Sequence, residues 1–171
     1  MIRYLLLFGI CIVYSCQSKI QHDRPEPQHN IVVNTSDSAM VVTAHPLATK
    51  AGIEILRKGG NAIDAAIAAH FALAVVYPRA GNLGGGGFLV YRSTDGVSDA
   101  LDFREKAPSQ AFEKMYQDSA GNIIRGKSLK GPTASGVPGS VAGMEAAFLK
   151  YSSLKNWEEL LEPAIGLAKE G

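Results

Sequence analysis

Cysteine is nearly absent from this chain of 171 residues. Its two cysteines, Cys11 and Cys16, both lie close to the N-terminus. If a targeting segment is cut before Cys16, no cysteine remains in the folded part. A disulfide framework is therefore excluded, even in a compartment that permits disulfide bonds.

The chain also lacks an excess of charge of either sign. Its 17 basic and 16 acidic residues give a net charge of +1, whereas a nucleic-acid-binding surface needs a strong basic excess or a basic stripe. It has no run of 18 or more apolar residues, so no segment has the length of a permanent membrane span. No histidine or carboxylate cluster has metal-ligand spacing. We therefore expect no nucleic-acid partner, no metal and no cofactor.

The N-terminus has the pattern of a targeting segment. Arg3 precedes an apolar stretch of signal-peptide length that ends at Val13. The residues that follow, up to Cys16, resemble a bacterial lipoprotein signal, in which the cysteine becomes the lipidated first residue. We expect a signal peptide over residues 1–15, then a lipidated Cys16 and a polar tether over residues 16–39. The domain would be secreted across the inner membrane and held at a membrane or in the periplasm; a plain secretory signal is the alternative.

The remaining residues, 40–171, alternate between strand and helix patterns, so periodicity alone indicates a mixed α and β fold. The helix pattern over residues 62–77 is apolar on all sides, which is typical of a helix inside a core. His70 is its only polar residue beyond the first turn, and we expect it to be a hydrogen-bonded core histidine. Strands are predicted over 40–43, 88–92 and 100–103, the last two as an antiparallel hairpin, and helices over 46–58, 62–77, 109–115, 139–151 and 157–169.

Residues 121–128 match the P-loop pattern G-x-x-x-x-G-K-[ST], but their surroundings exclude nucleotide binding. A P-loop follows a buried strand and opens a helix. Here polar, turn-like residues precede Gly121, and Pro132 breaks any helix that starts at Lys127.

The glycine run Gly84–Gly87 does not meet the dinucleotide-binding spacing, and it precedes a strand rather than following one. Glycines without a Cβ atom allow another chain segment or a ligand to approach closely. A tight connection into the strand is the alternative interpretation.

Arg104 is the strongest candidate for a binding residue. It directly follows an apolar strand, so a rigid element aims it. Its guanidinium is a planar fork that pairs bidentately with a carboxylate. A structural salt bridge with Glu105 or Asp102 is the alternative, and the charge pattern alone favours it.

Three segments together resemble the first part of the γ-glutamyltranspeptidases, the glutathione-hydrolysing members of the N-terminal-nucleophile hydrolases. They are GNLGGGGF (81–88), ALDFREKAP (100–108) and ASGVPGSVAGM (134–144), and the resemblance extends over residues 40–171. It implies an α+β fold, the αββα sandwich of these hydrolases, of which this chain lacks the downstream half. In that family the arginine at this motif position holds the α-carboxylate of the γ-glutamyl group, which assigns that role to Arg104.

The resemblance also implies a reaction: γ-glutamyl transfer or hydrolysis on glutathione and related compounds. A threonine freed by self-cleavage attacks the γ-glutamyl amide, and water or an amino acid then takes the acyl group. In the family this threonine lies far downstream, and we find no counterpart here. We therefore expect no catalytic residue in this chain, an inactive chain on its own, and a downstream segment or small subunit as its partner.

Several alternatives stay open at this point. The chain is a gene fragment, a truncated reading frame or one piece of a split protein. A related N-terminal-nucleophile amidase that acts on a β-lactam acyl amide or on poly-γ-glutamate would keep the fold and change the substrate. A catalytically inactive surface lipoprotein would keep the scaffold for binding only.

Overall fold

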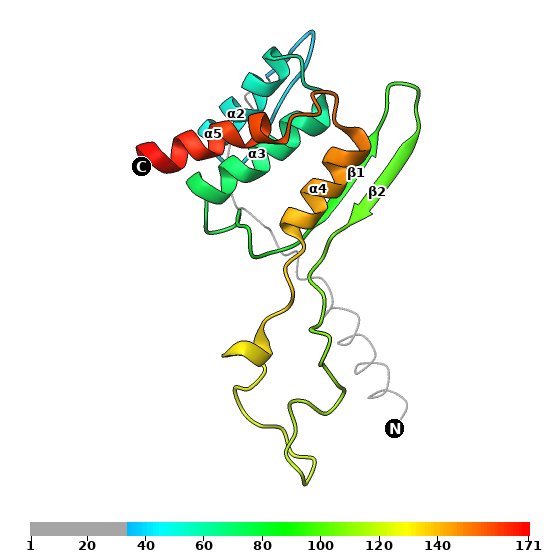
Figure 1. The fold of residues 1–171 in the computed structure, drawn as a ribbon, viewed down its shortest axis with the longest axis vertical. Coiled ribbons are helices and arrows are strands. Elements are labelled where there is room, and N and C mark those ends of the chain that lie inside the picture. The colour runs from blue at the N-terminus through cyan, green and yellow to red at the C-terminus, as the bar shows by residue number, and fades with distance from the viewer. Residues whose placement is uncertain (1–33) are drawn as a thin grey trace, which may run out of the picture. The chain divides into compact units, whose positions relative to one another are not determined.

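The computed structural model of the protein describes residues 34–171, a part of the chain that combines helices with a small sheet (Figure 1). The predicted signal peptide and the predicted lipidation site Cys16 lie outside these residues. Among the described residues, no helix is long and apolar enough to cross a membrane. The elements are α2 (Pro46–Arg57), α3 (Ala62–Val76), β1 (Phe88–Arg92), β2 (Ser98–Asp102), the 3-10 helix η1 (Pro132–Ala134), α4 (Ser140–Tyr151) and α5 (Trp157–Glu170).

Helix α2 begins and ends where its sequence predicts. The His45 ring accepts a hydrogen bond from the Leu47 backbone N–H at 3.3 Å, and Pro46 occupies the first turn, where its missing N–H costs nothing. The helix stops before Gly59, whose φ of 93° is accessible to glycine at little cost.

The N-terminus of α3 is tied to the connection between α4 and α5. Asn61 and Asp64 form a capping box, in which the Asn61 side chain accepts from the Asp64 N–H and the Asp64 carboxylate accepts from the Asn61 N–H. The buried Asp64 carboxylate also accepts from the N–H groups of Ser153 at 3.0 Å and Leu154 at 3.3 Å. One carboxylate therefore fixes the start of α3 against a segment about ninety residues away.

The core forms around α3, which packs against α2, α4 and α5 (Figure 1). Its many alanines allow the neighbouring helices to come close, and Phe71 meets Trp157 of α5 edge to face at 5.6 Å. The buried cluster consists of Ile55, Ile63, Ile67, Ala68, Phe71, Met144, Ala147, Leu160 and Ala164.

The hairpin pairs β1 with β2 in antiparallel register, as predicted, with Gly96 at positive φ in its turn. Alternate residues face opposite sides. Leu89, Tyr91 and Leu101 pack against the core, whereas Phe88 and Val90 on the other face are 63% and 84% exposed.

Two predicted elements do not form. Residues 40–43 are not a buried strand: they are irregular, and Met40 and Val42 are 51% and 81% exposed. A strand needs a neighbour for its backbone groups, and within the described part of the chain no strand pairs with this segment. Residues 109–115 form successive turns instead of a helix. So short a helix depends on packing, and Phe112 is 66% exposed.

Candidate functional site

Arg104 lies on a segment that is held from both sides. On one side Phe103 donates its N–H to Gly87 O at 3.0 Å and continues the hairpin pairing. On the other side Lys106 and Val137 exchange two backbone hydrogen bonds of 3.1 and 2.8 Å. The chain therefore fixes the backbone immediately before and after Arg104.

The two flanking segments are also bonded to each other. The N–H groups of Gly139 and Ser140 donate to Gly85 O at 2.9 and 3.0 Å, at the start of α4. The glycine run, the strand that leads to Arg104 and the segment that leads into α4 thus meet in space. These are the three segments that carry the sequence resemblance.

Glycine is required where these segments touch. A Cβ atom on Gly86 would lie 2.6 Å from Phe103 O and 2.9 Å from the Arg104 Cα. A Cβ on Gly139 would collide with the same Phe103 carbonyl, and one on Gly143 would collide with the Phe103 ring. The close approach predicted for the glycine run is therefore present at Gly86, and the approaching segment is the one that bears Arg104.

The side chain of Arg104 is 61% exposed and has two neighbours. Its Nε donates to Glu105 Oε2 at 3.2 Å, and its guanidinium carbon lies 5.7 Å from the centre of the Phe88 ring. Asp102 accepts from the Arg104 backbone N–H instead of pairing with its side chain. The salt bridge favoured by the charge pattern is thus present with Glu105, and such an exposed pair contributes little to stability.

The charges around Arg104 are nearly balanced. Hydrogen bonds from its own backbone N–H and from Arg104 hold the pKa of the Glu105 carboxyl below its usual range, so Glu105 is ionised at neutral pH. A cavity of about 290 Å³ adjoins the segment, and Arg104 and Lys106 are its two cationic lining residues. The anionic residue Asp102 also lines it, and its remaining walls are mainly apolar, with Val137 and Pro138 among them.

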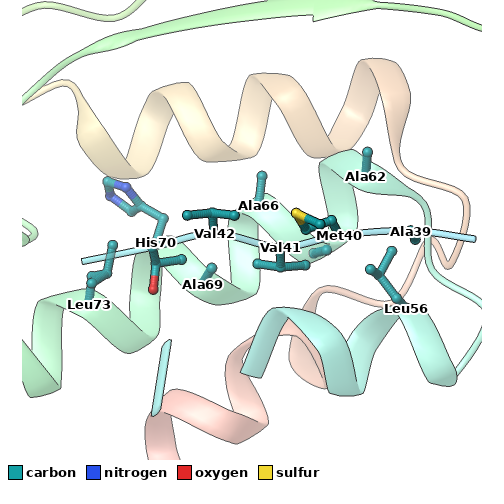
Figure 2. Close-up of a pocket in the computed structure, with 12 residues that line it drawn as sticks. Ala39, Met40, Val41, Val42, Leu56, Ala62, Ala66, Ala69, His70 and Leu73 are labelled. Atoms are coloured by element: carbon teal, nitrogen blue, oxygen red, sulfur yellow. The ribbon is translucent and has the colours of Figure 1, made fainter. Parts of the chain in front are cut away.

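A larger cavity of about 580 Å³ lies between residues 39–43 and α3 (Figure 2). His70 is at one end of it, and the other lining residues are mostly aliphatic. The prediction of a hydrogen-bonded histidine is wrong, because His70 Nε2 has no partner among the described residues. Burial lowers the pKa of His70 below its usual 6.5, so the ring is neutral at neutral pH.

The part of the chain that the structure describes has few other candidate metal-binding or catalytic groups. No group of three or more histidine, cysteine or carboxylate side chains there is arranged to hold a metal ion. Ser135, a hydroxyl residue of the segment 134–144, is exposed just after η1, and its hydroxyl forms no hydrogen bond with a described residue. Sequence reasoning missed Phe88 as a neighbour of Arg104; the signal was the antiparallel hairpin, whose register places Phe88 opposite Asp102.

Comparisons with known proteins identify the family of the chain. The family model described as Gamma-glutamyltranspeptidase matches residues 48–171. The chain is 54% identical over 136 residues to the glutathione hydrolase proenzyme of Pseudomonas sp. (strain A14), and 48% identical over 132 residues to that of Escherichia coli (strain K12). These matches cover 80% and 77% of this chain but 24% and 23% of the relatives.

Among solved structures, the Helicobacter pylori γ-glutamyltranspeptidase matches with a TM-score of 0.76 and 49% identity, over 82% of this chain and 40% of that one. The chain therefore belongs to the γ-glutamyltranspeptidase family, of which it represents the N-terminal portion. The predicted α+β class is confirmed, as a partial N-terminal-nucleophile hydrolase fold.

Proposed function

We propose that this chain supplies the donor-carboxylate site of an enzyme that transfers or hydrolyses γ-glutamyl groups of glutathione and related compounds. In this proposal Arg104 binds the α-carboxylate of the γ-glutamyl group. The observation that supports it is the double anchoring of the Arg104 backbone, by Gly87 on one side and Val137 on the other. A rigid segment that presents an exposed guanidinium beside a cavity is suited to bind a carboxylate.

We propose that the reaction also uses groups from outside the described residues. We propose that the nucleophile is a threonine from the part of the family's fold that has no counterpart in this chain, and that its own α-amine acts as the base. That part, as a downstream segment or a small subunit, is the proposed partner. The chain alone is then inactive.

We also propose the cellular arrangement that the N-terminal sequence indicates. Residues 1–15 are a signal peptide, Cys16 is lipidated, and residues up to 39 tether the γ-glutamyltranspeptidase portion, residues 40–171, to a bacterial membrane. The site then faces the periplasm or the exterior.

Kinetics on a completed enzyme test the role of Arg104. The full chain is fused to the region of the Pseudomonas relative that follows its match, and hydrolysis of γ-glutamyl-p-nitroanilide is measured. Arg104→Ala removes a charge-assisted bidentate contact and should cost roughly 2–4 kcal/mol, or about 30- to 1,000-fold in kcat/KM. Arg104→Lys should be nearly as harmful, because an ammonium cannot reproduce the fork.

Arg92→Ala is the matched control, because it removes an exposed arginine at the far end of β1. Its kcat/KM should stay within twofold of the parent fusion. Unchanged kinetics in Arg104→Ala would refute the assignment.

A further inference from the structure

Phe88 is placed where a large apolar side chain has no packing role in the described part of the chain. It is 63% exposed, on the face of the hairpin that points away from the core. The register pairs it with Asp102, two residues before Arg104, and the Arg104 guanidinium carbon lies 5.7 Å from its ring centre. A cation at this distance from an aromatic face is attracted by the ring quadrupole.

Glu105 contacts the same guanidinium group at its Nε atom. Its Oε2 accepts from Arg104 Nε at 3.2 Å. Among residues 34–171, that is the one hydrogen bond found for the Arg104 side chain, so both terminal nitrogens, Nη1 and Nη2, are free of protein partners there.

These two contacts act on Arg104 in opposite ways. As a charge, Glu105 repels a substrate carboxylate and weakens the attraction of Arg104 for it. As a restraint, it limits the rotation of a long exposed side chain, which lowers the entropy lost when a ligand binds. Because Glu105 bonds to Nε and leaves the Nη pair open, the geometry favours the restraint.

We infer that Phe88 and Glu105 are positioning residues for Arg104, which hold its guanidinium so that Nη1 and Nη2 together face a substrate carboxylate. This inference rests on the proposed function of Arg104. Neither residue touches the substrate in it, so their effects should pass through Arg104 alone.

The test measures KM and kcat of the completed fusion with two donors. One is γ-glutamyl-p-nitroanilide, and the other is 4-aminobutyryl-p-nitroanilide, which lacks the α-carboxylate. For the first donor, Phe88→Leu should raise KM about 2- to 5-fold, the range of an exposed cation–π contact. Glu105→Ala should raise it roughly 2- to 5-fold, the range of an exposed ion pair. The kcat should change less than twofold, and KM for the second donor should not change.

Conservative variants and a matched control separate positioning from folding. Phe88→Tyr keeps the ring and should behave like the parent, and Glu105→Gln keeps an acceptor oxygen and should lie between parent and Glu105→Ala. Val90→Leu, on the same exposed face, should have no effect. In an Arg104→Ala background, neither Phe88→Leu nor Glu105→Ala should raise KM further.

Three results would overturn the inference. A lower KM in Glu105→Ala would show that Glu105 acts only as a repelling charge. Equal effects with and without Arg104, or equal effects on both donors, would show a general structural role. If Arg104→Ala raises KM while Phe88→Leu and Glu105→Ala do not, the inference fails and the proposed function of Arg104 stands. If Arg104→Ala leaves KM unchanged, the proposed function of Arg104 fails.

Discussion

Replacing Asp64 by alanine removes a fully buried carboxylate whose Oδ2 accepts three backbone hydrogen bonds. The N–H of Asn61 loses its reciprocal capping bond, and the N–H groups of Ser153 and Leu154 lose their acceptor. Each bond to a charged acceptor contributes about 1.5–3 kcal/mol, and the orphaned donors lie at a part-buried junction. Since the three bonds share one oxygen, they do not add in full, and we expect a loss of roughly 3–5 kcal/mol.

Denaturant unfolding of the completed fusion measures this change through the shift in midpoint at constant slope. Asp64→Asn keeps one acceptor oxygen and should lose less than Asp64→Ala. Asp37→Asn is the matched control, because Asp37 is exposed and bonds to no described residue, and it should change stability by less than about 0.5 kcal/mol. A loss below about 1 kcal/mol in Asp64→Ala would refute the view that this carboxylate joins α3 to the α4–α5 connection.

Four further outcomes are expected. Gly143→Ala should destabilise the fold by about 1–3 kcal/mol, because the new methyl group collides with the Phe103 ring. Gly166→Ala should stabilise it by roughly 0.5–1 kcal/mol, because Gly166 lies inside α5 with open space around it. Thermal unfolding compares the two variants. Because the pKa of His70 is lowered in the folded state, its stabilising contribution is present above pH 6.5 and is lost as the pH falls below 6.5 towards the folded-state pKa. His70→Phe should therefore flatten the pH dependence of the unfolding free energy in that window. An unchanged pH profile would contradict the lowered pKa of His70. The chain by itself should not hydrolyse γ-glutamyl-p-nitroanilide and should aggregate when expressed alone, because apolar side chains such as Val90 are exposed; a soluble, cooperatively unfolding monomer would count against this. Mass spectrometry of the mature protein should find a lipid on Cys16, and an N-terminus at any other residue would end that proposal.

Helices α2, α3, α4 and α5 and the hairpin could be predicted from the sequence because their signals are local. Asn61 and Asp64 mark the start of α3 within four residues, and Pro46 and Gly59 mark both ends of α2. Capping and periodicity act between neighbours in the chain, so these elements form as the pattern predicts. The proposed role of Arg104 likewise rests on its own motif and stays a prediction.

The failures share one cause, which is dependence on distant partners. Residues 40–43 have the composition of a strand, but a strand exists only beside another strand, and none pairs with them in the described region. His70 was expected to find a hydrogen-bond partner, but its ring lies at the end of a largely aliphatic cavity. Neither environment can be predicted from the residues nearby in the sequence.

By itself, then, the sequence determined the local elements, the glycine positions and the family resemblance, because each depends on residues close together in the chain. Only the tertiary structure decided that the glycine run, the strand before Arg104 and the start of α4 meet. It alone placed the Phe88 ring beside the Arg104 guanidinium and showed that Arg104 Nε donates a hydrogen bond to Glu105. The physical reason is that such contacts depend on hairpin register and on the packing of helices against it, and these are set by the whole fold.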